Sequence, residues 1–244
     1  MELKVLGSCS RGNCYILESG TEALILEAGI PPKRVKQALG FNLSKVVGCL
    51  LTHEHGDHAK YAHELGRLGI TVYASGGTVE AIGATHRTEV LAPRVRHRLG
   101  GFTVLPFPVE HDVREPYGYL IHHKEAGNVL FATDTYYLQY TFAGLSNILI
   151  EANYALDILD EGVRRGTVHA AQRQRVLTSH MDIETCKGVL RANDLSAVNH
   201  IVLIHLSDTN SDAERFRREV AELTGKRVHI AVPDLVIPFN QTPF

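Results

Sequence analysis

The sequence predicts an α/β protein in which two sheets carry helices on their outer faces. Strand-like apolar runs dominate the first half of the chain, whereas helices and strands alternate in its last third. No low-complexity tract, repeat or linker rich in Gly, Ser or Pro divides the chain. We therefore expect residues 1–244 to form a single domain.

Short apolar runs bounded by turn residues predict the strands of the first half. They are residues 3–7, 14–19, 22–29, 46–52 and 71–75. Helical patterns lie between these runs, at residues 31–40, 59–69 and 77–84. The first helix has the expected ends, because proline opens it and Gly40 closes it.

The second half begins with further strand-like runs, at residues 102–110, 117–123, 128–133 and 147–153. The alternating part follows, with helices at residues 182–193 and 211–225 and strands at residues 200–206 and 227–232. Strands followed by alternating helices are typical of sheets that are covered by helices on the outside.

The composition is that of an ordinary globular protein, with 44% hydrophobic and 21% charged residues. No apolar run reaches the roughly 18 residues of a membrane span, and the N-terminus does not resemble a signal peptide. We therefore expect a cytoplasmic protein without membrane contact. The four cysteines form no Cys-x-x-Cys pair and are expected to be reduced thiols. The net charge of −2 gives no overall nucleic-acid footprint, but a local basic groove is compatible with it.

The most informative segment is CLLTHEHGDHAKY, residues 49–61. It places His53, His55, Asp57 and His58 within six positions, directly after a predicted strand. Buried imidazoles need polar partners, and a solvated loop does not need three of them. Imidazole and carboxylate groups together suit zinc, manganese or iron, and no thiolate lies nearby to favour a closed structural site. The spacing therefore favours a metal site over a histidine-rich loop.

Four side chains in one short segment cannot enclose two ions, so a dinuclear centre requires ligands from other strand ends. The sequence offers His111, Asp134 and His205, each directly after an apolar run. Core strands rarely carry an ionisable group at such a position. The recurrence predicts that several strand ends meet at one metal site.

In the order of these motifs, the chain resembles the metallo-β-lactamase superfamily over nearly its whole length. The resemblance implies an αβ/βα four-layer sandwich of two mixed sheets, with two divalent metal ions at one edge. Zn²⁺ or Mn²⁺ is expected ahead of iron. The implied ligands are His53, His55 and His111 for one ion and Asp57, His58 and His205 for the other, with Asp134 as the bridge.

Shorter motifs narrow the resemblance to the WalJ/YycJ-type branch, which is linked to DNA exonuclease activity. They are GSCSRGNCY (residues 7–15), EPYGYLI (115–121), ATDT (132–135), EAN (151–153) and HLSDTN (205–210). Two positions depart from the pattern. Glu27 stands where the superfamily usually has Asp, and SHMD around His180 replaces Gly-His-Leu-Ser. Because glutamate is one methylene longer, its hydrogen bond to a ligand would need a shifted backbone.

The resemblance implies a dinuclear-metal-dependent phosphodiesterase. Two ions activate a bridging hydroxide and stabilise the charge of an in-line displacement at phosphorus. We expect a DNA exonuclease, with DNA ahead of RNA as the substrate and with Asp57 contributing to catalysis as well as to metal binding.

An alkoxide leaving group benefits from a proton donor outside the metal ligands. Glu151 ends an apolar run but belongs to no ligand motif, and His180 lies just before the predicted helix 182–193. By resemblance to tRNase Z-like phosphodiesterases, Glu151 orients His180, and His180 protonates the leaving oxygen. The alternative is that Glu151 is a solvated strand end and His180 a neighbour of a helix cap.

Contacts to the substrate are expected from the polar turn at residues 7–13. There Ser8, Ser10 and Asn13 would line the cleft and hydrogen-bond a phosphate, although an ordinary hairpin turn is the alternative. Residues 93–98 and 164–175 are rich in arginine. They would either contact phosphates or form solvated helix faces.

Two other functions are compatible with the fold. The same metal pair polarises carbonyl groups, so a glyoxalase II-like thioester hydrolase is the alternative, whereas β-lactamase classes with a Cys at the bridging position are disfavoured. An iron-holding sensor would need a flavodoxin-like partner domain, for which 244 residues leave no room.

Overall fold

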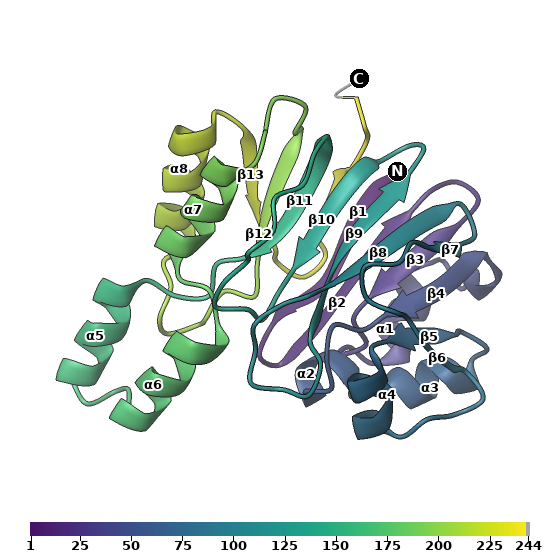
Figure 1. Cartoon of the computed structure of the whole chain (residues 1–244), viewed down its shortest axis with the longest axis horizontal. Coiled ribbons are helices and arrows are strands. Elements are labelled where there is room, and N and C mark those ends of the chain that lie inside the picture. The colour runs from purple at the N-terminus through teal and green to yellow at the C-terminus, as the bar shows by residue number, and fades with distance from the viewer. Residues whose placement is uncertain (243–244) are drawn as a thin grey trace.

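Two seven-stranded sheets pack face to face in the computed structural model, which describes residues 1–242, and helices cover both outer faces (Figure 1). Both sheets contain parallel and antiparallel strand pairs. The predicted four-layer sandwich of two mixed sheets is therefore confirmed. None of the helices within residues 1–242 is long and apolar enough to cross a membrane.

The first sheet is formed by the N-terminal strands and one strand from the C-terminus. Its spatial order is β14 (Val236–Pro238), β1 (Glu2–Cys9), β2 (Gly12–Glu18), β3 (Ala23–Leu26), β4 (Val46–Leu50), β5 (Val72–Ala74) and β6 (Thr88–Val90). The short helical segments between these strands are α1 (Pro32–Ala38), the 3₁₀ turn η1 (Leu43–Lys45), α2 (Gly56–Ala59), α3 (Ala62–Arg67) and α4 (Gly76–Ile82).

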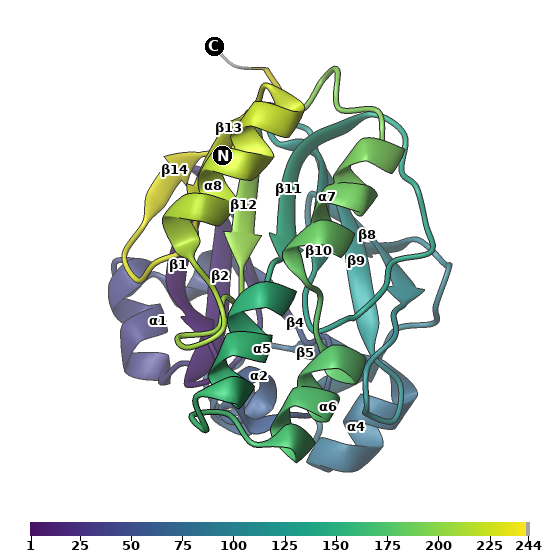
Figure 2. The same ribbon diagram turned by 90° about the vertical axis from the view of Figure 1, so that its left-hand side faces the viewer.

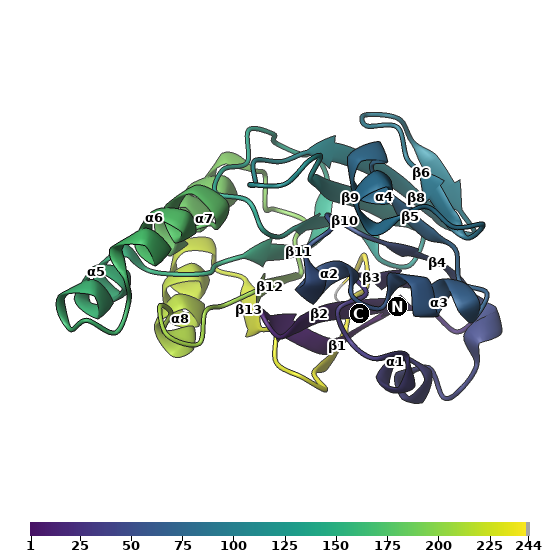
Figure 3. The same cartoon turned by 90° about the horizontal axis from the view of Figure 1, so that it is seen from below.

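The second sheet has the order β13 (Arg227–Ile230), β12 (His200–Ile204), β11 (Leu145–Glu151), β10 (Gly127–Ala132), β9 (Tyr117–His123), β8 (Phe102–Pro108) and β7 (His97–Leu99). Its helices are α5 (Leu156–Arg164), α6 (Ala170–Ser179), α7 (Ile183–Ala192) and α8 (Ala213–Thr224). Helices α7 and α8 lie over the sheet, whereas α5 and α6 lie beyond its lower end (Figure 2). Seen from below, α5 and α6 project away from the body of the protein (Figure 3).

Apolar residues fill the space between the layers. Buried Tyr15, Phe102, Tyr119 and Phe131 belong to the cluster between the two sheets. Separate clusters hold the outer helices against each sheet. A small cluster around Leu159 joins α5 to α6. The space between the two sheets is therefore mainly apolar, and polar side chains concentrate where the strands end.

Several strands end at the same edge of the sandwich. Strands β10, β11 and β12 are mutually parallel, as are β3 and β4 in the other sheet. Glu27, Asp134 and His205 follow β3, β10 and β12 and have left-handed backbones, with φ of 68°, 47° and 54°. Left-handed backbone is uncommon outside glycine and costs about 1–3 kcal/mol at such positions. At these three residues, the left-handed backbone turns the chain sharply after the strand.

The structure differs from the sequence-based prediction in a few elements. The turn expected over residues 7–13 is shorter, because β1 extends to Cys9 and β2 begins at Gly12. The helix expected at residues 59–69 is divided into α2 and α3. Strands β6, β7 and β14 have three residues each and were not predicted, whereas the equally short β5 lies within the predicted run of residues 71–75.

Candidate metal centre and acid pair

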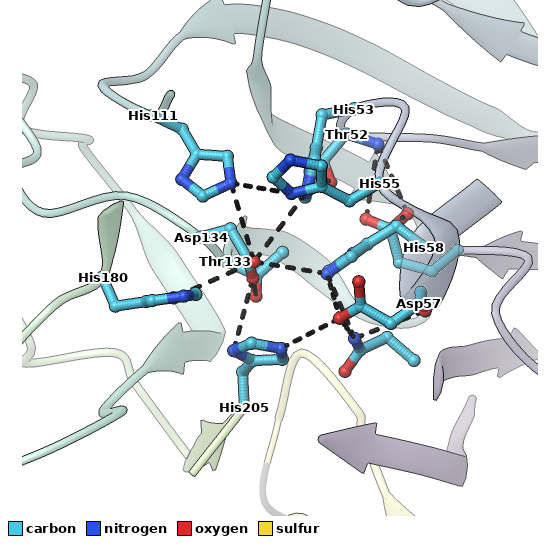
Figure 4. A network of polar contacts seen from close by, with 12 residues as sticks. Thr52, His53, His55, Asp57, His58, His111, Thr133, Asp134, His180 and His205 are labelled. Carbon is cyan, nitrogen blue, oxygen red and sulfur yellow. Dashed lines mark hydrogen bonds and ion pairs between the residues drawn. The ribbon is translucent and has the colours of Figure 1, made fainter. Parts of the chain in front are cut away.

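All seven predicted metal ligands meet at the edge of the sandwich where the strands end (Figure 4). His53, His55, Asp57 and His58 lie on the segment that leads from β4 through α2, and the other three follow β8, β10 and β12. In Figure 4 the histidines surround the carboxylate of Asp134. Chain segments that are far apart in sequence thus supply one cluster.

The first group of candidate ligands consists of His53, His55 and His111. His55 Nδ1 lies 3.2 Å from His111 Nε2. The His111 ring has a fixed tautomer, because its Nδ1 donates a hydrogen bond to the Ser179 carbonyl at 2.8 Å. The Nε2 lone pair therefore faces the other rings. His53 Nε2 is buried and has no hydrogen-bond partner among the described residues.

The second group consists of Asp57, His58, Asp134 and His205. His58 Nε2 lies 3.2 Å from Asp57 Oδ2 and 3.3 Å from Asp134 Oδ2. His205 Nε2 lies 3.3 Å from the same Asp57 oxygen. The four donor groups therefore point at a common centre.

These spacings fit bound metal ions. Ligands about 2.0–2.1 Å from a tetrahedral zinc ion are separated from one another by roughly 3.3–3.4 Å. Four of the donor pairs lie 3.2–3.3 Å apart, and all the candidate donor atoms of each group lie within 4.8 Å of one another. A buried imidazole nitrogen such as His53 Nε2 would also gain the partner that it lacks. The two His/Asp groups are typical of a dinuclear metal site.

At His53 and Asp134 the surroundings favour the protonation state that metal binding needs, whereas the neighbouring carboxylates raise the pKa of His58 and His205. Burial, followed by the nearby His58, lowers the pKa of His53 well below its ordinary value. Burial alone would raise the pKa of Asp134, but His205 and His58 hold it well below the usual range. His53 is thus neutral and Asp134 ionised near neutral pH, as metal ligands must be.

Glu27 occupies the position where the superfamily pattern has Asp. Its carboxylate is fully buried and accepts the Thr52 N–H at 3.3 and 3.4 Å. One oxygen lies 3.6 Å from His58 Nδ1, slightly beyond hydrogen-bonding distance. The longer Glu27 side chain therefore lies beside the candidate ligand His58. The Glu27 backbone is in the left-handed region.

Glu151 and His180 form a pair at the edge of the cluster. His180 Nδ1 lies 2.7 Å from Glu151 Oε1, and the same oxygen lies 3.1 Å from His205 Nδ1. The other oxygen, Oε2, accepts hydrogen bonds from the N–H groups of Thr135 and Met181 at 3.0 and 3.1 Å. Glu151 is fully buried and therefore fixes both rings, one of which is a candidate metal ligand.

Within this pair, each residue favours the charged form of the other. Burial alone would raise the pKa of Glu151, but His180 keeps it below its ordinary value. Burial alone would lower the pKa of His180, whereas Glu151 and Asp134 raise it. His180 Nδ1 lies 3.9 Å from Asp134 Oδ2, so a protonatable ring lies directly beside the candidate metal centre. Asp134, Glu151, His180 and His205 are also close enough to hold an ion themselves.

A model of the Metallo-beta-lactamase superfamily matches residues 7–137, more than half of the chain. The chain belongs to this superfamily.

Individual members support the predicted branch. The chain is 29% identical over 240 residues to exodeoxyribonuclease YycJ of Bacillus anthracis, covering 91% of this chain and 89% of that protein. It is 28% identical over 228 residues to exodeoxyribonuclease WalJ of Streptococcus pneumoniae, with coverages of 86% and 83%. The metallo-beta-lactamase fold protein YhfI of Bacillus subtilis has a similar structure, with a TM-score of 0.73, 16% identity and coverages of 97% and 98%. The chain is thus homologous to exodeoxyribonuclease YycJ/WalJ.

The three residues expected to contact substrate lie in different environments of this superfamily fold. Ser8 is buried, and its hydroxyl accepts the backbone N–H of His205 at 2.9 Å. Asn13 is also buried, and its Nδ2 lies 3.1 Å from both Asp57 Oδ2 and His58 Nε2. Ser10 faces an open cavity. Ser8 therefore contacts the backbone of the candidate ligand His205, whereas Asn13 contacts the donor atoms of Asp57 and His58.

A cavity of about 230 Å³ opens beside His180. It lies between α6 and the segment that follows β12, and it is lined by Ser10, Asn153, Gln172, Arg175, Val176, His180, His205, Leu206, Ser207 and Asn210. Of the seven arginines in the two predicted basic segments, Arg175 alone lines this cavity. The cavity thus adjoins the candidate metal centre, since His205 belongs to both.

Several supporting residues were not predicted as parts of the site. Thr52 Oγ1 contacts His53 Nδ1 at 2.9 Å, and Thr133 Oγ1 donates to Asp134 Oδ1 at 2.7 Å. Asn153 Nδ2 donates to the His205 carbonyl at 2.8 Å. Each threonine precedes a candidate ligand in sequence, and Asn153 lies in the quoted EAN motif. These supporting residues could therefore have been predicted from their position beside the candidate ligands at the strand ends.

Proposed function

We propose that this chain is a dinuclear-metal-dependent phosphodiesterase that removes nucleotides from an end of DNA. The observation that carries the proposal is the 2.7 Å contact between His180 and buried Glu151, beside the His/Asp cluster. It supplies a proton donor in addition to the metal ligands, which an alkoxide leaving group requires. Homology to two proteins named exodeoxyribonuclease supports DNA as the substrate.

The chemistry divides between the ions and the chain. When bound, the two ions generate a nucleophile from water and offset the charge of the phosphoryl group. The first and second groups of ligands would hold the ions; Asp57 belongs to the second group, and Asp134 lies between the two groups. Glu151 accepts the hydrogen bond from His180 Nδ1, which leaves Nε2 to carry the transferable proton. That proton passes to the leaving oxygen as its bond to phosphorus breaks, and His180 becomes neutral.

The same pair argues against the alternative function. A glyoxalase II-like reaction expels a thiolate, which leaves without protonation more readily than an alkoxide does. A buried carboxylate dedicated to a proton donor would have little effect on that reaction. The His180–Glu151 contact therefore favours phosphodiester hydrolysis over thioester hydrolysis.

The substrate class is tested with metal-reconstituted protein. We expect cleavage of end-labelled DNA, single-stranded or double-stranded, in preference to RNA, thioester and β-lactam substrates. The rate should fall steeply with salt, because contacts to several phosphates release counterions. Fast thioester turnover without nuclease activity, in preparations cleared of contaminating nucleases, would overturn the proposal.

The proton-donor role is tested with His180→Ala. The variant should keep both metal equivalents and lose about 10²–10⁴-fold in turnover, the usual contribution of general acid catalysis. The defect should shrink on a p-nitrophenyl phosphodiester, whose leaving group needs little protonation. His169→Ala, at the exposed opposite end of α6, is the control. Loss of one metal equivalent would instead make His180 a ligand, and equal defects on both substrates would exclude proton donation.

A further inference from the structure

The cavity beside His180 has the chemistry of an anion site. We propose that it binds the DNA phosphate next to the scissile one, on the leaving side, with Arg175 as its principal contact. This assignment rests on the proposed phosphodiesterase function and names a specificity-determining residue for it. None of the ten residues that line the cavity is a carboxylate, whereas Arg175 contributes a cation and Gln172, Ser10 and Ser207 contribute side-chain donors.

Arg175 is the cation in this region that is not engaged elsewhere at close range. Its side chain is 66% exposed, and its nearest recorded carboxylate oxygen, on Asp112, lies 3.9 Å away. In contrast, Arg164 lies 2.5 Å from Glu161 and Arg173 lies 2.7 Å from Asp160. The first of these ion pairs lies within α5 and the second connects α6 to α5, whereas the guanidinium of Arg175 is available to a phosphate.

Asn210 gives independent evidence for a ligand. Its side chain lines the cavity, is 3% exposed, and carries an Oδ1 atom with no hydrogen-bond partner among the described residues. Its backbone is fixed, because its N–H donates to Ser207 Oγ at 3.2 Å and its carbonyl accepts from Ala155 at 2.9 Å. Buried polar groups are normally paired. Since the two ends of an amide are assigned from their partners, a turned Asn210 would offer its NH₂ to a phosphate oxygen.

The position of the cavity determines which phosphate it would hold. His180 lines the cavity together with His205 of the His/Asp cluster, and its Nδ1 lies 3.9 Å from Asp134 Oδ2. The oxygen that His180 protonates belongs to the leaving part of the substrate, which must therefore extend toward Arg175. A volume of about 230 Å³ is below the roughly 300 Å³ at which pockets for drug-sized ligands begin. It suits a phosphate and its sugar.

Binding to DNA is measured with the full chain in chelator, which prevents cleavage, by fluorescence anisotropy of a labelled single-stranded oligodeoxynucleotide. Arg175→Ala should weaken binding about tenfold, as expected for a lost charge-assisted hydrogen bond. It should also reduce the salt slope of log K by about 0.7, the value for one phosphate of a single strand. Arg164→Ala removes the same charge from the neighbouring helix at 72% exposure and should leave both values unchanged.

A second pair of variants tests the same surface by adding charge. Gln172 and Gln174 are both exposed on α6, but Gln172 lines the cavity and Gln174 does not. Gln172→Glu should therefore weaken binding by repelling the phosphate, whereas Gln174→Glu should not. With metal-loaded enzyme, Arg175→Ala should raise the KM for DNA more than the KM for bis(p-nitrophenyl) phosphate, which has no second phosphate.

The outcomes separate this inference from the proposed function. Arg175-dependent binding of DNA in a protein that cleaves none would support the anion site and overturn the phosphodiesterase. Efficient DNA cleavage with equal effects of Arg175→Ala and Arg164→Ala would support the enzyme and overturn the anion site. Equal effects of Gln172→Glu and Gln174→Glu would also overturn it, because they would reflect overall charge.

Discussion

The carboxylate of Asp134 lies between the two groups of candidate ligands. Its Oδ2 atom is 3.3 Å from His58 Nε2 in the second group and 3.9 Å from His53 Nε2 in the first. Asp134→Asn keeps the size of the side chain, and Asn tolerates the left-handed backbone found there. We expect about two metal equivalents per chain in the wild type and clearly fewer in this variant, measured by elemental analysis. Asp234→Asn, at an exposed position with the same left-handed backbone, is the control, and unchanged metal content in Asp134→Asn would exclude a bridge.

Glu151 connects the proton donor to the metal centre, because one oxygen contacts both His180 and His205. Glu151→Gln should therefore lower turnover in the same manner as His180→Ala but more weakly. It should also weaken the second ion roughly 10–100-fold, as changes to residues that orient metal ligands do. Chelator competition measures that affinity, and exposed Glu110→Gln is the control. Unchanged affinity would limit Glu151 to orienting His180.

The cluster was predictable because ionisable side chains follow apolar runs, a pattern visible without any tertiary contact. The positions of Ser8 and Asn13 were not predictable in this way. Whether a serine faces the cleft or bonds to His205 depends on how the two sheets pack, and local sequence does not encode that packing. Likewise, nothing local distinguishes Arg175 from Arg164, because only the fold places one of them at the cavity.

Among the elements, most strands and helices α7 and α8 were predicted, and α5 and α6 were missed. The segment that forms these two helices is rich in charged and polar residues, and its apolar contacts are made mainly between the two helices. Helix α6 lacks the apolar face that predicts packing against a sheet, and in the amphipathic helix α5 the one buried residue is Leu159. Helices α7 and α8 have that face, so their amphipathic pattern was sufficient.

The edge strand β13 and its neighbour β12 carry a histidine pair away from the metal centre. His200 Nδ1 lies 3.0 Å from His229 Nε2. Burial, followed by His229 and Arg227, lowers the pKa of His200 to about 4. Because an unfolded histidine has a pKa of about 6.5, the unfolded chain binds more protons between these values. The contribution of neutral His200 to stability is therefore complete above pH 6.5 and is lost as the pH falls toward 4.

The corresponding experiment is urea unfolding of chelated protein at pH 7 and pH 5. The free energy of unfolding should decrease more in the wild type than in His200→Gln, which cannot take up the proton. His86→Gln, at an exposed position, should behave like the wild type. The same decrease in wild type and His200→Gln would contradict this origin of the pH dependence.

At the scale of the whole molecule, the candidate metal centre joins the two sheets. His53 to His58 follow a strand of the first sheet, and His111, Asp134 and His205 follow strands of the second. The sequence predicted both sheets and the shared edge. It did not predict that β14 returns from the C-terminus to pair with β1, because a three-residue antiparallel pairing across the whole chain leaves no local signal.

Ions that bridge both sheets should stabilise the folded chain against global unfolding. A ligand at about 100 times its Kd contributes roughly 2.7 kcal/mol, and 1 kcal/mol corresponds to about 2–4 °C in Tm for a chain of this size. Removing each ion with a chelator should therefore lower the Tm by about 5–11 °C at that ion concentration, measured by calorimetry. Asp134→Asn should show a smaller chelator effect, because its ions are already weakly held. An unchanged Tm after verified metal loss would mean that the site is equally formed without its ions and does not couple the two sheets.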